Sequence, residues 1–206
     1  CLLLLEKDDH WAAERQRQAG PGTQAVLTDA LRFDWSRITP AYPWKIAGNL
    51  PYNVASPMLW DMVAQARGLQ RGVFMVQKEV GQRLAARPGT SHYGALSVWV
   101  QSFVRPRLEF IVGPGAFSPP PKVDSAVLTF EPLPEAARPP HAAELSRLLK
   151  ICFQQRRKQI GGIFRRCGDA ALLTLPEEAG LAPQLRPEQL SVADFHRLSA
   201  LLAAKA

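Results

Sequence analysis

The stretch from Trp44 to Ala66 reads WKIAGNLPYNVASPMLWDMVAQA and combines a short apolar segment with a longer amphipathic one. Its start, Trp44 to Ala47, is nearly continuous in apolar residues, which is typical of a strand buried on both faces of a parallel sheet. The part from Ser56 to Ala66 has helical spacing, and Ser56-Pro57 predicts an N-cap followed by proline at the first helical position. A strand that leads directly into a helix is the repeating unit of an α/β fold.

The same alternation continues on both sides of this stretch. Short apolar runs predict further strands at 2–5, 25–28 and 73–76, and amphipathic spacing predicts helices at 9–18, 79–86 and 94–103. Such alternation implies a layered α/β fold with a parallel sheet. Two later strands are predicted at 108–112 and 125–131, joined by a loop rich in proline.

Prolines punctuate residues 132–140, and the pattern beyond them is helical to the end of the chain. Further helices are predicted at 142–153, 156–167, 170–175 and 192–204. We therefore predict two domains, an α/β domain over residues 1–135 and a small all-helical domain over residues 140–206.

The composition excludes several classes of protein. With 47% apolar and 21% charged residues, the 206-residue chain is an ordinary globular protein, and it has no apolar run of the roughly 20 residues that span a bilayer. Its three cysteines and four histidines form no ligand-like cluster, so we expect neither a metal site nor a disulfide scaffold. Cysteine usage of this kind favours a reducing, cytoplasmic compartment.

The formal net charge of +7 suggests a polyanionic partner. The chain is expected to be a monomer.

A candidate binding site follows the strand at 44–47, where Asn49-Leu50-Pro51-Tyr52 come at the carboxyl end of a parallel strand. The Asn49 side-chain oxygen and the Leu50 carbonyl can both accept hydrogen bonds from an exocyclic amino group, and Pro51 fixes the backbone between them and Tyr52. Tyr52 offers a flat face on which a base can stack, worth about 1–3 kcal/mol per base. A strand-to-helix turn that merely favours Asn and Pro is the alternative interpretation.

A second unusual segment is AFSPPPKVDSAV at 116–127. Its three consecutive prolines force a stiff, extended loop that presents Phe117. Phe117 could close on a base from the face opposite Tyr52, and a buried core aromatic is the alternative for this residue.

In this order and spacing, the two segments resemble the ribosomal RNA adenine dimethyltransferases, in particular the bacterial enzymes that act near the 3′ end of 16S ribosomal RNA. The likeness covers essentially the whole chain. It includes Gln77-Lys78-Glu79-Val80, Tyr93-Gly94-Ala95-Leu96-Ser97 and Gln155-Arg156-Arg157-Lys158. Erythromycin-resistance methylases share the Asn-(Leu/Ile)-Pro-Tyr motif, but their tails match less closely.

The resemblance implies a Rossmann-like, S-adenosylmethionine-dependent methyltransferase domain followed by a helical domain. It implies transfer of methyl groups from S-adenosylmethionine to N6 of two adjacent adenosines in a loop near the 3′ end of 16S ribosomal RNA, within the small ribosomal subunit. It assigns Glu6 to the donor's ribose hydroxyls, Asp29 and Ala30 to the donor's adenine, and Asn49 to the space between donor and target. The residues that it implies around the target adenine are Asn49, Leu50, Pro51, Tyr52 and Phe117.

One departure from the family pattern concerns the donor pocket. The family's glycine-rich turn lies one strand before Glu6, and neither that strand nor the turn has a counterpart here. The chain starts with Cys1 inside an apolar run, which favours an N-terminally truncated chain over a mature lipoprotein. We therefore expect the chain by itself to bind S-adenosylmethionine poorly.

Basic residues concentrate in the predicted helical domain, with seven of them between residues 141 and 166 against a single acid. Several fall at helical spacings that can share one face, which suits contacts to RNA phosphates. The predicted RNA-binding residues are Arg147, Lys150, Arg156, Arg157 and Lys158. A solvated helix face is the alternative interpretation.

Two other functions remain open from the sequence. A non-catalytic ribosome-assembly factor or RNA-binding module would use the same fold, and the incomplete donor site leaves room for it. A DNA adenine methyltransferase typically carries a motif like Asp-Pro-Pro-Tyr, and the arginine-rich helical tail is unlike that class.

Overall fold

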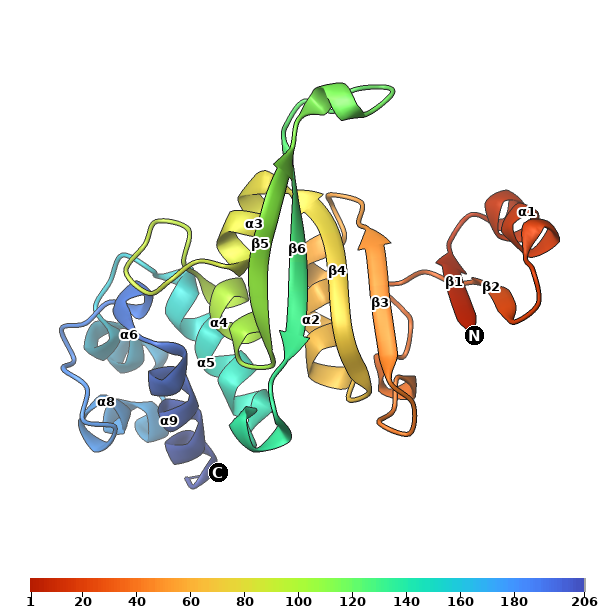
Figure 1. Ribbon diagram of the computed structural model, residues 1–206. Coiled ribbons are helices and arrows are strands. Elements are labelled where there is room, and N and C mark those ends of the chain that lie inside the picture. The colour runs from red at the N-terminus through yellow and green to blue at the C-terminus, as the bar shows by residue number, and fades with distance from the viewer. Residues whose placement is uncertain (206) are drawn as a thin grey trace.

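The computed structural model describes residues 1–205, and its centre is a four-stranded mixed sheet (Figure 1). The strands run in the order β3-β4-β6-β5. Their bounds are β3 Trp44–Asn49, β4 Leu69–Gln77, β5 Val104–Val112 and β6 Ser125–Pro132. β3 and β4 are parallel as predicted, whereas β5 and β6 are antiparallel to each other and β6 is antiparallel to β4. The sheet is therefore mixed rather than wholly parallel, because a loop without a crossover helix joins the two late strands as a hairpin. No direction was predicted for these two strands.

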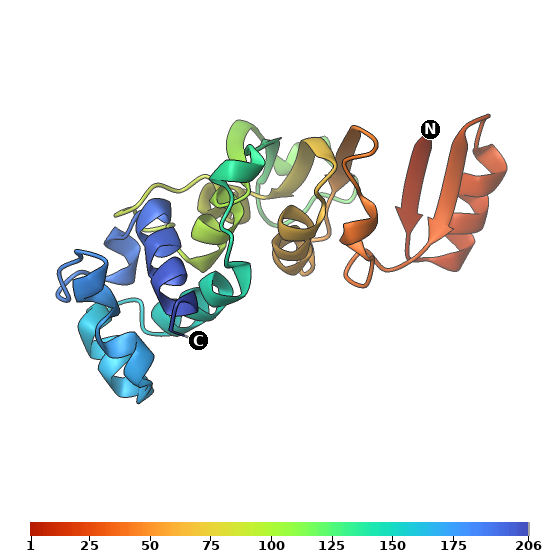
Figure 2. The same ribbon diagram turned by 90° about the horizontal axis from the view of Figure 1, so that it is seen from below.

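A separate two-stranded parallel sheet is formed by β1 (Leu2–Glu6) and β2 (Thr23–Leu27), with α1 (Asp9–Gln18) as the crossover between them. Asp8 caps α1, since its side chain accepts a hydrogen bond from the Trp11 N–H. Figures 1 and 2 show this unit standing beside β3 at one end of the molecule. Within residues 1–205 no strand ladder joins β1 to β3.

Three helices cover one face of the four-stranded sheet, namely α2 (Ala55–Gln65), α3 (Lys78–Leu84) and α4 (Ala95–Gln101) (Figure 1). Gly81 allows α3 to lie close against β6, because a Cβ there would be only 2.8 Å from the Ala126 Cβ. The sheet contributes Phe74 and Leu128 to the apolar core on this side.

The start of α2 differs from the prediction. The helix begins at Ala55, its N-cap is Val54, and no side chain caps it. Ser56 is therefore not the N-cap, and Pro57 is the third helical residue. Proline is tolerated there because the N–H groups of the first turn have no partner within the helix.

The helical part contains α5 (Ala142–Gln154), α6 (Ile160–Cys167), α7 (Ala170–Leu173), α8 (Leu175–Glu178) and α9 (Val192–Ala203). The helix predicted at 156–167 starts four residues later, because Gln159 is extended and acts as the N-cap. The helix predicted at 170–175 ends early, and Pro176 lies in the first turn of the next one.

The α/β part ends with β6 at Pro132, and the helical part begins with α5 at Ala142. Buried apolar side chains of both parts nevertheless belong to one cluster, with α5 packed against α4 and α9. The division into two domains therefore stays a prediction. No helix within residues 1–205 is long and apolar enough to cross a membrane.

Candidate functional site

The first candidate segment, residues 49–52, turns the chain from the end of β3 into α2. The Leu50 N–H donates to the Met75 carbonyl at 2.9 Å and so extends the contact between β3 and β4 by one residue. The Leu50 side chain then folds back into the core, where it is 7% exposed. Gly48 makes room for it, because a Cβ at that position would be 2.9 Å from Leu50 Cδ2. The Pro51 carbonyl accepts hydrogen bonds from the N–H groups of Val54 and Ala55, which starts the helix.

This turn leaves two hydrogen-bond acceptors available at the end of the strand. The Asn49 side chain is exposed. Neither its amide nor the Leu50 carbonyl has a hydrogen-bond partner among the described residues 1–205. Both groups can therefore accept hydrogen bonds from a bound molecule.

Tyr52 connects the two candidate segments. Its hydroxyl lies 3.2 Å from the Oγ of Ser125, the buried first residue of β6. The residue as a whole remains 36% exposed. The structure thus holds the tyrosine at its hydroxyl end and leaves part of the ring available for stacking.

The proline-rich loop is anchored at its base and extends beyond the end of the sheet (Figure 1). Lys78 joins α3 to this base, since its Nζ lies 2.9 Å from Asp124 Oδ2 and its N–H donates to the Asp124 carbonyl. A cavity of about 400 Å³ lies next to this ion pair and is lined in part by Gln82 and Lys122.

Phe117 lies on the extended part of this loop, is half-buried, and does not belong to the apolar core. Among the described residues, Tyr52 and Phe117 make no ring contact. The structure therefore brings the two segments to the same end of the sheet without closing the predicted aromatic clamp.

The two carboxylates predicted to bind a donor lie at the carboxyl ends of neighbouring strands. Glu6 ends β1, and its Oε1 accepts from the N–H groups of Lys7 and Asp8 at 2.8 and 3.0 Å. Asp29 follows β2, with Oδ2 2.8 Å from Lys7 Nζ and Oδ1 accepting from the Leu31 N–H. The hydrogen bond from Lys7 and then that from Leu31 lower the pKa of Asp29, so this carboxyl stays ionised.

Both carboxylates suit hydroxyl and amino groups, because an ionised carboxylate is an acceptor with two oxygens. They belong, however, to the two-stranded sheet, whereas Asn49 belongs to the larger one. Within residues 1–205 the glycines closest in sequence to Glu6 are Gly20 and Gly22, which precede β2 rather than follow a strand end. Within residues 1–205, Glu6 and Asp29 thus offer acceptors for the polar groups of a donor, but no glycine-rich turn lies beside them.

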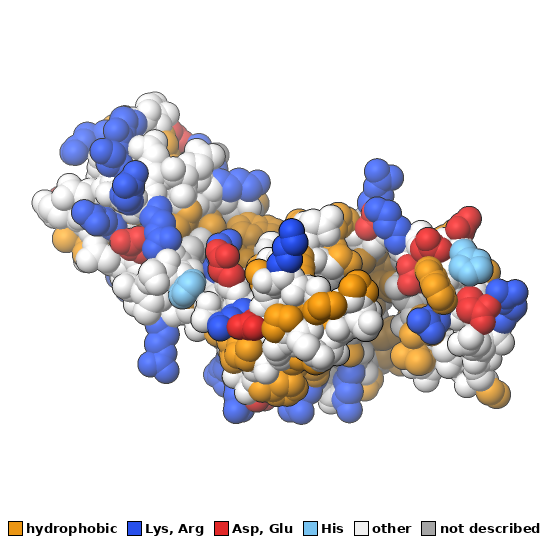
Figure 3. All heavy atoms as spheres, turned by 90° about the horizontal axis from the view of Figure 1, so that it is seen from above, with side chains coloured by type: hydrophobic (Ala, Val, Ile, Leu, Met, Phe, Trp, Pro, Cys, Tyr) orange, Lys and Arg blue, Asp and Glu red, His pale blue; other side chains and the backbone are white. Residues whose placement is uncertain are grey.

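The five predicted RNA-binding residues divide into two groups. Arg147 pairs with Asp169, and Arg156 pairs with Glu188. Lys150, Arg157 and Lys158 are exposed and have no ion pair among the described residues. Figure 3 shows Lys and Arg side chains gathered over the helical part, at the left of that view. Because α5 ends at Gln154, Arg157 and Lys158 lie in the following turn rather than on the face of one continuous helix.

Sequence reasoning assigned no role to Ser125 or to the Lys78–Asp124 pair. Each of these residues lies in one of the segments that carry the family resemblance. The ion pair could have been suspected from the sequence, because one of these segments carries Lys78 and the other carries Asp124. Nothing in the sequence pointed to Ser125 as the partner of Tyr52. Whether two hydroxyl groups meet depends on how close the ends of β3 and β6 lie in space.

Comparisons with known proteins place the chain among RNA-modifying enzymes. The family model described as "Ribosomal RNA adenine dimethylase" matches residues 2–204. The chain is 51% identical to "Ribosomal RNA small subunit methyltransferase A" of Nitratidesulfovibrio vulgaris, over 100% of this chain and 78% of that protein. It is 53% identical to the protein of the same name from Oleidesulfovibrio alaskensis, over 98% of this chain and 72% of that protein.

Two solved structures share the fold. A dimethyladenosine transferase from Plasmodium falciparum aligns with a TM-score of 0.78 at 22% identity, covering 95% of this chain and 79% of the other. The 23S rRNA methyltransferase ErmE aligns with a TM-score of 0.62 at 20% identity, covering 98% and 81%. These likenesses bear out the predicted α/β, Rossmann-like methyltransferase fold.

Proposed function

The chain belongs to the ribosomal RNA adenine dimethylase family, and on that premise we propose how its residues carry out the reaction. Membership and the relatives' names make it an S-adenosylmethionine-dependent enzyme that dimethylates adenosines of 16S ribosomal RNA. We propose that its targets are two adjacent adenosines in a loop near the 3′ end, presented within the small ribosomal subunit. The observation that carries the proposed chemistry is the pair of acceptors, Asn49 and the Leu50 carbonyl, which have no partner among residues 1–205 and lie in the same turn as the exposed Tyr52.

In this proposal the acceptors prepare the adenine amino group for reaction. That group is a poor nucleophile because its lone pair is delocalised into the ring. When Asn49 and the Leu50 carbonyl accept its two hydrogens, the lone pair becomes more localised and is aimed in one direction. The methyl donor supplies an electrophilic methyl group on a sulfonium. Catalysis then consists mainly of positioning and electrostatics, and the proton can leave after the new bond has formed.

The aromatic residues hold the target base outside its RNA stack. A base in a helix or loop must be extruded before an enzyme can act on it, and stacking on Tyr52 offsets part of that cost. Phe117 supplies the second face when the proline-rich loop moves over the base. Pro51 keeps the backbone between Leu50 and Tyr52 stiff, so that the acceptors and the ring keep their relative positions.

Donor and RNA contacts complete the proposal. Glu6 accepts from the donor's ribose hydroxyls, and Asp29, with Ala30 beside it, accepts from the donor's adenine amino group. Lys150, Arg157 and Lys158 are the cations that contact RNA phosphates, since they have no ion pair among the described residues. No metal takes part in the proposed reaction.

The test is a methyl-transfer assay with unmodified small ribosomal subunits and radiolabelled S-adenosylmethionine, whose concentration is raised until incorporation no longer increases. We expect N6,N6-dimethyladenosine in the nuclease digest of the 16S RNA, and little of it with Asn49→Ala. Binding of the subunit without methyl incorporation would instead favour a non-catalytic assembly factor. That alternative is consistent with one observation, the separation of the Glu6–Asp29 sheet from the sheet that carries Asn49.

A further inference from the structure

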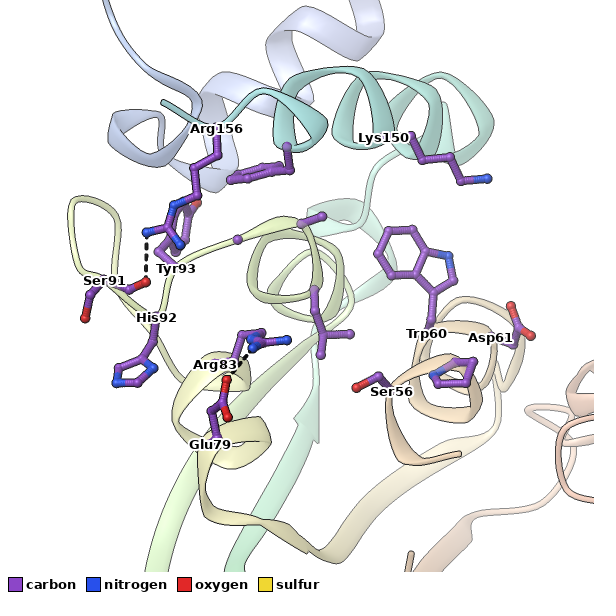
Figure 4. Close-up of a pocket in the computed structure, with 15 residues that line it drawn as sticks. Ser56, Trp60, Asp61, Glu79, Arg83, Ser91, His92, Tyr93, Lys150 and Arg156 are labelled. Carbon is purple, nitrogen blue, oxygen red and sulfur yellow. Dashed lines mark hydrogen bonds and ion pairs between the residues drawn. The ribbon is translucent and has the colours of Figure 1, made fainter. Parts of the chain in front are cut away.

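A larger cavity, of about 840 Å³, lies between the α/β part and the helical part and includes none of the residues proposed for methyl transfer (Figure 4). Its walls come from α2, from α3 with residues 91–96, and from α5 with the turn after it. Its volume is within the range of about 300–1,000 Å³ that small organic ligands occupy. The first turns of α2 line it, and α2 starts at Ala55, three residues after Tyr52.

One wall of the cavity is a rigid aromatic platform. The indole of Trp60 is stacked on that of Trp99, with centroids 4.4 Å apart and planes 4° apart. Trp99 is buried, and its Nε1–H donates to the Trp60 carbonyl at 2.7 Å. The stack fixes the orientation of Trp60, whose remaining uncovered surface borders the cavity (Figure 4). A ring that is already ordered costs little entropy on binding, which makes it a good surface for a nucleobase.

The charged groups around this platform are complementary to a nucleotide. Lys150 extends from α5 on the Trp60 side of the cavity, is exposed, and has no ion pair among the described residues (Figure 4). Asp61 is also exposed and lacks an ion pair within the described chain. Arg83 is held by Glu79 at 2.7 Å. A free ammonium suits a phosphate, and a free carboxylate accepts from the exocyclic amino group of a base.

The cavity is held open by contacts between the two parts of the protein. Arg156 donates from Nε to Glu188 Oε2 at 2.7 Å and from Nη2 to the Ser91 carbonyl at 2.8 Å. The Tyr93 hydroxyl donates to the Leu190 carbonyl at 2.9 Å. These bonds fix residues 91–93 to the helical part, so the walls need little rearrangement when a ligand binds.

We propose that this cavity is a second RNA subsite, which takes one unpaired nucleotide with an amino-bearing base on Trp60 and its phosphate on Lys150. The proposal rests on the proposed function in that RNA is the ligand and Lys150 one of its phosphate contacts; the stacking of a base on Trp60 is what it adds. RNA is favoured over a peptide or a small metabolite because Lys150 lies on α5, in the segment 141–166 that carries seven basic residues against a single acid. The subsite adds a contact to the RNA and requires no methyl transfer.

The first test measures binding of the full chain to short single-stranded RNA at several salt concentrations, without donor. Lys150→Gln should weaken binding several-fold and reduce the slope of log affinity against log salt by about one. Trp60→Leu should weaken binding roughly tenfold, and Trp60→Phe should retain part of the affinity. Lys45→Gln is the matched control, since Lys45 is also exposed but lies on β3, outside the cavity.

The second test concerns base preference and compares oligoadenosine with oligouridine, which lacks an exocyclic amino group. It is made in the Asn49→Ala background, which removes one of the two acceptors of the strand-end site. Asp61→Ala should lower the ratio of the affinity for oligoadenosine to the affinity for oligouridine. The ratio is compared, and not one affinity, because removing a negative charge strengthens the binding of any RNA phosphate.

The outcomes separate this subsite from the proposed function. If Lys150→Gln and Trp60→Leu leave RNA affinity and salt slope at the wild-type values, the subsite is overturned while methyl transfer is unaffected. If methyl transfer fails but these variants weaken RNA binding as expected, the subsite stands and the proposed reaction falls. Because Lys150 is exposed, Lys150→Gln stays informative even if the Trp60 variants fail to fold.

Discussion

The Tyr52 hydroxyl lies 3.2 Å from Ser125 Oγ and joins two segments that are 73 positions apart in the chain. The contact holds one end of the tyrosine ring at the start of β6, next to the base of the proline-rich loop. Tyr52 stays partly exposed, so the hydroxyl can anchor the side chain while the ring is proposed to stack on a base.

These two roles can be tested separately. Tyr52→Phe keeps the ring and loses the anchor, so we expect turnover to fall by about fivefold, the equivalent of a hydrogen bond worth about 1 kcal/mol. Tyr52→Ala should lose considerably more, because stacking is lost as well. Ser125→Ala should match Tyr52→Phe, and the double variant Tyr52→Phe/Ser125→Ala should be no worse than either alone. Additive losses in steady-state kinetics would contradict a shared contact.

Asn49→Ala should separate catalysis from binding. The side chain is exposed and has no partner among the described residues, so its loss should leave folding and RNA affinity nearly unchanged. Turnover should fall by about 10²–10³-fold, as for removal of one transition-state hydrogen-bonding group. Single-turnover rates and RNA affinity should be measured on the same samples. An equal loss of both would indicate a structural role for Asn49.

Arg156 and Arg157 are neighbours with different expected roles. Arg156→Gln breaks the contacts to Glu188 and Ser91 and should lower the free energy of unfolding by about 1 kcal/mol, since the ion pair is only partly buried. Arg157→Gln should leave stability unchanged and reduce the salt slope of RNA binding by about one. Denaturant titration and binding at several salt concentrations measure the two effects. The prediction fails if the two variants behave alike.

His196 makes stability depend on pH. It is half-buried, its Nε2 lies 2.8 Å from Ser102 Oγ, and burial lowers its pKa from the usual 6.5. The unfolded chain therefore binds this proton at a higher pH than the folded one does. The free energy of unfolding should fall as the pH drops below 6.5, until the folded-state pKa is passed. His196→Gln should flatten this part of the curve.

Donor binding by this chain should be weak. Glu6 and Asp29 lie on the two-stranded sheet, Asn49 lies on the larger one, and within residues 1–205 no ladder connects the two sheets. Calorimetry with S-adenosylmethionine should therefore give little heat at micromolar concentrations. Tight, micromolar binding would show that Glu6 and Asp29 act together with Asn49 despite this separation.

Much of the fold could be predicted from local pattern. The strand at 44–47 and the helix at 9–18 were recognisable because a buried strand and an amphipathic helix each have a characteristic spacing of apolar residues. The errors lie at boundaries, as at Ser56 and Gln159, where the chain's tertiary contacts decide which residue is the first of the helix. The direction of β5 and β6 also could not be read from their composition.

The amino-acid sequence by itself determined the chemistry that the strand end can perform and the family to which the chain belongs, because both reside in residue types at fixed local spacing. Only the tertiary structure decided which partners these residues have. It paired Tyr52 with Ser125, Lys78 with Asp124 and Arg156 with Glu188, and it stacked Trp60 on Trp99. Such pairs depend on how helices and strands pack, and their members are too far apart along the chain for any local pattern to reveal them.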